Sequence, residues 1–331
     1  MNQLLLAGDI GGTKTNIAVY PASGELKPVV ERSYLNCDFD GIDALLRQFH
    51  HDSGVTASAA CLAVAGAVQR GCCDMPNLGW NINGALLART FNFRYCHLLN
   101  DLAATAYGID MLAPEQLLVI NAGEADLEGN CALIAAGTGL GEAIMFRTAN
   151  GLHVSASEGG HADFAANDEQ QIALLRYLKA DMQHVSWERV VSGPGLKNIY
   201  DALHKVMGYQ QPDWLLERFI EMNDPAAVIA ESALDESSEI CVRAMEIFLA
   251  AYGAEAGNLA LKAFATGGVY IGGGIAPKIL PLFQQPNFMT AFLNKGRFAE
   301  LLAKVPVKVI LEPKTALHGA ACYLAAQAAL Y

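Results

Sequence analysis

The sequence has little charge and few basic residues for its length. Only 17% of its 331 residues are charged, and 22 Lys and Arg oppose 34 Asp and Glu, which gives a formal net charge of −12. Wide contact with nucleic acid needs clustered Lys and Arg, so this balance argues against a nucleic-acid partner. The hydrophobic fraction of 53% argues against disorder. A phosphate can still be bound, because the backbone N–H groups of one glycine-rich loop suffice.

The sequence also lacks the patterns of zinc sites, disulfide frameworks and membrane segments. Its eight cysteines include no C-x-x-C pair and no His/Cys grouping with zinc spacing. Most of them lie in apolar runs, which predicts buried free thiols in a reducing compartment. The N-terminal residues have no basic segment, and no apolar run reaches membrane-spanning length. We therefore expect a cytoplasmic protein with no membrane partner.

Strand patterns alternate with helix patterns along the chain, which predicts an α/β fold. The expected strands are 4–10, 60–66, 95–99, 131–136, 305–311 and one that begins at 269. The expected helices are 41–52, 86–91, 102–109, 168–183, 238–265 and 315–330. Two hairpins with glycine-rich bends, at 4–20 and 131–146, suggest a duplicated α/β unit, and the length predicts about two domains.

Three glycine-rich bends are candidates for phosphate binding. The Rossmann and P-loop templates both fail on spacing. What remains is the bend Asp9–Thr13, where glycine N–H groups and the Thr13 hydroxyl can reach a phosphate and Asp9 can hold Mg²⁺ or one of its waters. An ordinary hairpin turn with a turn-forming Asp fits this bend alone equally well. The further bends at Gly137–Gly139 and Gly272–Gly274 favour a nucleotide.

Acidic and polar side chains form a second set of candidates. Asp101 follows a predicted strand and can accept the proton of a hydroxyl that attacks a γ-phosphoryl group, although Asn100 or Asp101 could also simply cap the next helix. Glu158 and His161 suit a ligand rich in hydroxyl groups, and a structural loop histidine fits the same spacing. Together with the glycine bends, these residues predict an ATP-using enzyme that phosphorylates a hydroxyl group.

Two more residues each have a functional and a structural interpretation. Glu188 can bind a hydroxyl group or lie exposed in the first turn of a helix. Asn77 can present its amide to a sugar or belong to a Pro-Asn turn anchored by Trp80.

Eight short segments carry a family resemblance. They are Gly8–Thr13, Met75–Trp80, Leu99–Ala104, Ala136–Gly141, Glu158–Phe164, Glu188–Gly195, Gly267–Gly274 and Asn294–Phe298. In this order, and over nearly the whole chain, they resemble the bacterial glucokinases of the hexokinase and actin-like ATPase superfamily. The resemblance implies a two-domain ribonuclease-H-like α/β fold with a cleft between the domains. The small domain would comprise 1–111 plus 312–331, and the large domain 112–311.

The resemblance also implies an activity, namely ATP-dependent phosphorylation of D-glucose to glucose 6-phosphate by a cytoplasmic homodimer. Asp101 would be the general base on the 6-hydroxyl. The implied sugar-binding residues are Asn77, Asn100, Asp101, Glu158, His161 and Glu188. The implied ATP-binding residues are Asp9, Gly11, Gly12, Thr13, Thr138, Gly139, Gly272, Gly273 and Gly274, and Asp9 would hold Mg²⁺ directly or through a water.

One residue departs from the pattern of these glucokinases. Lys14 stands where they often carry Asn, and Lys is usual there in the related ROK sugar kinases. Residues 162–181 contain no cysteine, however, so the ROK zinc motif is missing and no structural zinc is expected. The non-ROK group therefore fits better.

Three alternatives stay open from the sequence. The enzyme could phosphorylate another hexose (fructose, mannose or N-acetylglucosamine), or use ADP or polyphosphate as the donor. A non-catalytic sugar-sensing regulator of the same fold is the third, and it would need a DNA-binding segment ahead of the first strand.

Overall fold

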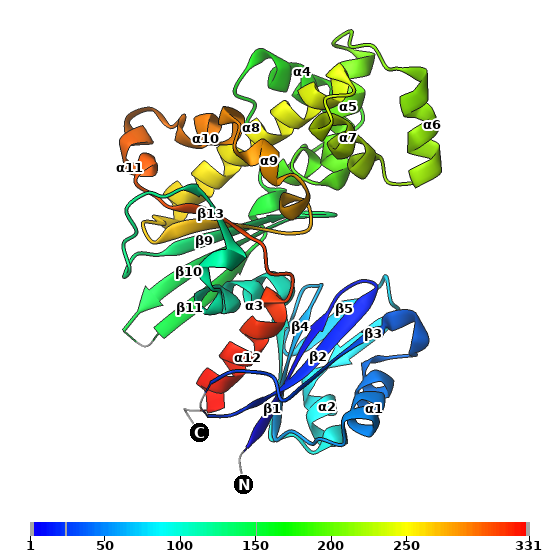
Figure 1. The fold of residues 1–331 in the computed structure, drawn as a ribbon, viewed down its shortest axis with the longest axis vertical. Coiled ribbons are helices and arrows are strands. Elements are labelled where there is room, and N and C mark those ends of the chain that lie inside the picture. Colours follow the sequence, from blue (N-terminus) through cyan, green and yellow to red (C-terminus); the bar gives the residue numbers. More distant parts are fainter. Residues whose placement is uncertain (1–2, 24, 150, 329–331) are drawn as a thin grey trace. The chain divides into compact units, whose positions relative to one another are not determined.

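The computed structural model describes residues 3–23, 25–149 and 151–328, and the chain divides into two compact units. The first unit contains the described residues up to Pro114 together with the chain from Glu312 onward, and the second is Glu115–Leu311. Both units combine a sheet with helices (Figure 1), which confirms the predicted α/β class.

The first unit is built on a five-stranded sheet with the order β3-β2-β1-β4-β7. These strands are β1 (Leu4–Ile10), β2 (Lys14–Pro21), β3 (Val30–Leu35), β4 (Ala59–Val64) and β7 (Cys96–Asn100). The predicted hairpin is β1 with β2, which pair antiparallel, whereas β1, β4 and β7 run parallel. The carboxyl ends of β1, β4 and β7 therefore lie at one edge of the sheet, which is where α/β proteins commonly place binding groups.

Helices cover both faces of this sheet. Successive side chains of β1 point to opposite faces, and those on each face are apolar, so each face packs against helices. Leu6 and Ile10 belong to the core that includes side chains of α1 (Ile42–Ser53) and α2 (Gly84–Phe91). Leu5 and Ala7 belong instead to the core beneath α12 (Thr315–Ala328), which also packs on α3 (Asp101–Gly108). The C-terminal helix was predicted to reach residue 330, and its last two residues lie outside the described part.

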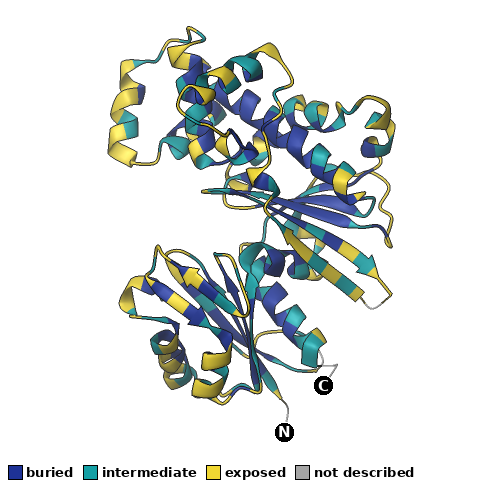
Figure 2. Ribbon diagram, turned by 180° about the vertical axis from the view of Figure 1, so that it is seen from behind, coloured by how far each residue is buried: buried dark blue, intermediate teal, exposed yellow. Residues whose placement is uncertain are grey.

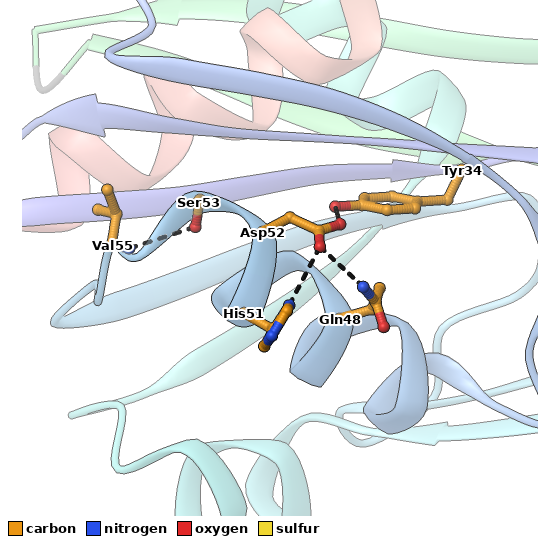
Figure 3. A network of polar contacts seen from close by, with 6 residues as sticks. All are labelled: Tyr34, Gln48, His51, Asp52, Ser53 and Val55. Atoms are coloured by element: carbon orange, nitrogen blue, oxygen red, sulfur yellow. Dashed lines mark hydrogen bonds and ion pairs between the residues drawn. The ribbon is translucent and has the colours of Figure 1, made fainter.

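A cluster of hydrogen bonds joins the end of α1 to β3 (Figure 3). The Tyr34 hydroxyl donates to Oδ2 of Asp52 at 3.0 Å, and Nε2 of Gln48 donates to Oδ1 at 2.7 Å. Nδ1 of His51 lies 3.4 Å from the same Oδ1. The bond from Tyr34, followed by those from Gln48 and His51, holds the pKa of Asp52 below its ordinary value. This acid therefore stays ionised and anchors α1 on the strand.

The second unit repeats the plan of the first with one more strand, in the order β11-β10-β9-β12-β13-β8. The strands are β8 (Leu117–Asn121), β9 (Cys131–Ala136), β10 (Leu140–Thr148), β11 (Gly151–Ser157), β12 (Gly268–Gly272) and β13 (Val307–Ile310). As in the first unit, three antiparallel strands (β11, β10 and β9) are followed by two strands, β12 and β13, that run parallel to β9, and the extra strand β8 pairs antiparallel with β13. This correspondence agrees with the duplication that the two glycine-bearing hairpins suggested.

The long helix α8 (Glu239–Ala263) of the second unit is largely buried (Figure 2). The other helices of this unit are α4 (Glu169–Lys179), α5 (Gly193–Lys205), α6 (Asp213–Met222), α7 (Pro225–Leu234), α9 (Leu280–Phe283), α10 (Pro286–Leu293) and α11 (Ala299–Ala303). Helix α8 packs against α5, α7 and α10 and against the sheet. Apolar residues of α4, α5, α7, α8 and α10 share one hydrophobic core with the sheet. The sequence predicted α4 and α8 but not α5, α6 or α7.

The cysteines follow the prediction in part. Cys61, Cys73, Cys131 and Cys241 are buried free thiols, whereas Cys37 is exposed and the remaining three are half-buried. The expectation of burial is wrong for Cys37 because it lies in a short 3₁₀ helix, Asn36–Asp38, that turns only Asn36 into the interior. Among the described residues, no helix combines the length and apolar character that a membrane span needs.

Candidate functional site

Two aspartates lie at the carboxyl edge of the first sheet. Asp9 is near the end of β1, and Asp101 follows β7 directly as the first residue of α3. The parallel strand β4 separates β1 from β7, so the fold brings together two acids that are 92 positions apart in sequence. Oδ1 of Asp101 accepts a hydrogen bond from the Leu102 amide at 2.8 Å.

The surroundings of these aspartates favour their protonated forms more than water does. Burial and the negative charge of Asp101 raise the pKa of Asp9 to about 6, and a hydrogen bond from Asn16 opposes this rise. Burial also raises the pKa of Asp101, against the effect of the hydrogen bonds it accepts. Carboxyl groups with a raised pKa are suited to exchanging protons near neutral pH.

A buried amide holds the glycine bend beside Asp9. Asn36 is 2% exposed, and its Nδ2 donates to the Gly11 carbonyl at 2.8 Å while its own amide N–H donates to the Thr13 carbonyl at 2.9 Å. The Thr15 hydroxyl completes this set by donating to Oδ1 of Asn36 at 2.7 Å. Gly12 and Thr13 are exposed. Sequence reasoning missed Asn36, because no motif includes it and its partners are more than 20 positions away.

Asn100 and Asn77 both occupy the structural positions that were considered as alternatives. Oδ1 of Asn100 caps α3 by accepting from the amides of Leu102 and Ala103 at 3.0 and 3.3 Å. Its Nδ2 donates to the Gly66 carbonyl at 3.2 Å. Asn77 lies in an exposed turn between β5 (Cys72–Met75) and β6 (Trp80–Asn83). The predicted sugar-binding role of Asn100 and Asn77 stays a prediction, because a residue in a helix cap or a turn can also bind a ligand.

In the second unit, Glu188 is joined to the second glycine bend. It lies half-buried in a short 3₁₀ helix, and its Oε2 accepts from the Leu140 amide at 2.9 Å. A Cβ on Gly139 would lie 2.5 Å from this Oε2. The bend therefore approaches Glu188 so closely that only glycine fits at this position. The exposed-helix interpretation of Glu188 is therefore wrong, because this carboxylate is held by the protein backbone.

Glu158 and His161 flank a turn of two glycines that follows β11. Gly159–His161 forms a 3₁₀ helix, and the His161 amide donates to the Glu158 carbonyl at 3.0 Å. Both side chains are exposed and make no hydrogen bond within the described part of the chain. They are free to bind a ligand.

A cavity of about 540 Å³ lies in the second unit between the glycine bends and the helices α5 and α7. Among its lining residues are Gly137, Thr138, Gly193, Leu196, Lys197, Ala226, Ala230, Gly274, Ile275, Lys278 and Ile279. Its walls are mostly small or apolar, and its charged lining residues are Lys278, Asp224 and Lys197, which is paired with Asp201 at 2.7 Å. Such a cavity is large enough for a flat heterocycle.

Only part of the predicted nucleotide set lines this cavity. Thr138 and Gly274 do so, whereas Gly139 lies against Glu188 and Gly272 is buried at the end of β12. The walls from α5 and α7 were missed, although the sequence contains signals for both helices. Ser192 and Asp224 each cap a helix whose first turn contains a proline, which is a recognised start pattern.

Comparisons with known proteins fit this arrangement. A sequence model described as glucokinase matches residues 6–327. The chain belongs to the glucokinase family. A glucokinase from Nostoc sp. is 42% identical to it, with 96% of this chain and 98% of the relative covered. The crystal structure of a glucokinase from an Antarctic psychrotroph has a TM-score of 0.87 at 33% identity and covers 98% of this chain and 99% of its own.

A more distant neighbour shares the fold alone. A ROK family glucokinase from Streptomyces griseus, solved in complex with glucose and AMPPNP, has a TM-score of 0.63 at 17% identity, with 97% of this chain and 99% of the neighbour covered. Membership of the glucokinase family confirms the predicted resemblance, the fold class and the prediction that the chain is an enzyme, a sugar kinase.

The site residues of this glucokinase-family chain are divided between its two units. Asp9, Asn77 and Asp101 belong to the first, together with the Gly11–Thr13 bend. Glu158, His161, Glu188, the cavity and the other two glycine bends belong to the second. Within the described ranges, no group of three or more His, Cys, Asp and Glu side chains is placed to hold a metal ion by itself.

Gly273 shows how closely the third bend packs, and it provides a stability test. Its φ is +84°, and an added Cβ would lie 2.2 Å from the Ala136 carbonyl oxygen, whereas a Cβ on Gly274 would have no atom within 4 Å. Gly273→Ala should therefore lower the free energy of unfolding by about 3 kcal/mol through overpacking and backbone strain. Gly274→Ala should change it by less than about 0.5 kcal/mol.

Urea unfolding of both variants, followed by circular dichroism, measures this difference. Equal midpoints for the two variants would show that the bend does not have the described geometry.

Proposed function

We propose that the chain transfers the γ-phosphoryl group of ATP to the 6-hydroxyl of D-glucose. The observation that carries this proposal is the placement of Asp101 at the carboxyl edge of the first sheet, half-buried and with a raised pKa, in a chain of the glucokinase family. The distant neighbour that was solved with glucose and AMPPNP supports the choice of both substrates.

In this proposal Asp101 acts as the general base. Its Oδ1 already accepts from the Leu102 amide, which fixes the carboxyl group and leaves Oδ2 for the glucose 6-hydroxyl. The raised pKa makes the carboxylate a better proton acceptor than an exposed aspartate. As the hydroxyl oxygen attacks phosphorus, Asp101 takes its proton, and positioning and charge stabilisation provide the rest of the catalysis.

The remaining glucose hydroxyls are assigned to Asn77, Asn100, Glu158, His161 and Glu188. The side chains of Glu158 and His161 are unengaged, so they can bind hydroxyl groups without breaking a protein contact. Glu188 uses Oε2 on the Leu140 amide and has Oε1 left for the sugar. Both polar atoms of the Asn100 side chain already make hydrogen bonds, Oδ1 in the helix cap and Nδ2 to the Gly66 carbonyl. We therefore expect Asn100 to contribute less to glucose affinity than the other residues.

The nucleotide is assigned to the cavity of the second unit and to the glycine bends. The adenine ring would lie among the apolar walls from α5 and α7, and Thr138 and Gly139 would contact the phosphates together with Gly11, Gly12 and Thr13. Gly272 and Gly273 form the turn that brings Gly274 to the cavity. Backbone donors can meet the phosphates without basic side chains.

A magnesium ion fits the donor set beside Asp9. Mg²⁺ is commonly held by one or two carboxylates, waters and the phosphates of the nucleotide, so a group of three protein ligands is not needed. When bound, it would neutralise charge on the β- and γ-phosphates. Asp9 would hold the ion directly or through a water, and Asn16 orients the Asp9 carboxyl group. The homodimer and the cytoplasmic location are further parts of this proposal.

Replacement of Asp101 tests the assignment of the base. Asp101→Asn keeps the oxygen that accepts from Leu102 but cannot take the proton, so kcat should fall by about 10³ while the KM for glucose changes little. Steady-state assays with a coupled enzyme measure both constants, and Asp40→Asn, at an exposed aspartate of the same unit, serves as the control. A folded Asp101→Asn variant with more than a tenth of the wild-type kcat would contradict the assignment.

Filling the cavity tests the adenine site separately. Ala230 lines the cavity from α7, and Ala230→Leu should raise the KM for ATP by about tenfold through steric exclusion while leaving the KM for glucose unchanged. Ala303→Leu, at an exposed position of α11, should leave both constants unchanged. A rise in the KM for glucose without a rise for ATP would place the nucleotide elsewhere.

A further inference from the structure

Two buried carboxyl groups face each other in the second unit outside the assigned site. Glu142 on β10 is 1% exposed and Glu255 on α8 is 0% exposed, and their side chains are within hydrogen-bonding contact. Two ionised carboxylates repel, so a hydrogen bond between them requires that one of them carry a proton. Nothing in the proposed mechanism uses this pair.

The surroundings indicate which carboxyl group carries the proton. Glu255 is the acceptor of two hydrogen bonds, from Nδ2 of Asn258 at 2.8 Å and from Nζ of Lys262 at 3.1 Å. Lys295 also lies near Glu255. Glu142 has no such donor: its Oε1 is buried without a hydrogen-bond partner, and the remaining titratable neighbour, Tyr252, is neutral. The proton therefore belongs on Glu142.

Glu142 also packs directly against the turn that carries Glu158 and His161. Its Oε2 occupies the place where a side chain on Gly159 would start, since an added Cβ would lie 1.9 Å from that oxygen. The next residue, Gly160, is packed equally closely, since an added Cβ there would lie 2.0 Å from the Leu140 carbonyl oxygen. A displacement of the Glu142 carboxyl group is thus transmitted to the turn without an intervening side chain.

We propose that Glu142 is a positioning residue for sugar binding, and that its protonated carboxyl group, hydrogen-bonded to Glu255, holds the Glu158–His161 turn in the conformation that binds glucose. This inference rests on the proposed function, because it assigns Glu158 and His161 to the sugar. Glu142 itself touches neither substrate, and it acts only through the position of the turn.

The arrangement makes glucose affinity depend on pH. Burial, followed by the nearby charge of Glu255, raises the pKa of Glu142 to about 7. Below that pH the pair shares its hydrogen bond and the turn is held. Above it, two buried anions repel, the Glu142 carboxylate moves, and the turn leaves its binding conformation. The KM for glucose rises with pH, whereas kcat is unaffected because no reacting atom is involved.

The test is the pH profile of the KM for glucose between pH 6 and 9 in three forms of the protein. Wild-type KM should rise by up to about fivefold from pH 7 to pH 8, because the protonated fraction of Glu142 falls from about one half to about one eleventh. Glu142→Gln keeps a neutral donor to Glu255 at every pH, so its KM should stay low and flat. Glu142→Leu removes the hydrogen bond, so its KM should be high and flat.

Glu239→Gln is the matched control, since it makes the same substitution at an exposed residue of α8. It should retain the wild-type profile. A wild-type KM that does not rise, or a Glu142→Gln profile parallel to the wild type, would overturn the inference. Wild-type protein that phosphorylates no glucose at pH 6.5 would instead refute the proposed function.

Thermal unfolding provides a readout that does not need activity. Because the pKa of Glu142 is higher in the folded protein than in the unfolded chain, the wild type loses stability as pH rises from about 4.5 to about 7. Glu142→Gln lacks this loss, so its Tm should exceed that of the wild type increasingly over this interval and by a constant margin above it. A constant difference at all pH values would show that Glu142 does not titrate in the folded protein and would overturn the inference.

Discussion

The burial of Asp9 and Asp101 at one edge of the first sheet is the constraint on which the other features of that edge depend. Each residue is half-buried, so its carboxyl group is partly removed from water, and one carboxyl group repels the other. Both therefore need polar partners. Amides provide these: Asn16 hydrogen-bonds to Asp9, Asn100 caps the helix that begins with Asp101, and Asn36 holds the adjoining glycine bend. The edge is stabilised by neutral donors, which leaves the acids available for a proton and for a metal ion.

The two units share a strand order but carry different functional features. Both place a glycine bend after the first strand of an antiparallel hairpin, but the bend of the first unit adjoins two acids, whereas that of the second adjoins a cavity. The formal charge of −12 is therefore compatible with nucleotide binding, because the backbone N–H groups of the glycine bends would meet the phosphates. Under the proposed function Asp101 would act on the sugar hydroxyl, and Asp9 would hold the metal ion beside the phosphates.

The sequence predicted those parts of the structure that depend on local pattern. Both hairpins, the acids at the carboxyl ends of β1 and β7, and the long helix α8 follow from apolar runs, glycine bends and helical spacing. Asn36 and Glu142 could not be found in this way, because each is a single polar residue whose role depends on partners distant in sequence. The walls from α5 and α7 were missed for a different reason: their Ser-Gly-Pro and Asp-Pro starts were present but not interpreted.

Under the proposed function, hydroxyl phosphorylation by this chain depends on glucose, ATP and Mg²⁺ together. Release of ADP, coupled to NADH oxidation, should be measured with D-glucose, fructose, mannose, N-acetylglucosamine or no sugar, each with Mg²⁺ and with excess EDTA. We expect fast ADP release with glucose and Mg²⁺, and only a small background without sugar or without Mg²⁺. ADP release that no sugar stimulates, or that continues unchanged in EDTA, would contradict the proposed function.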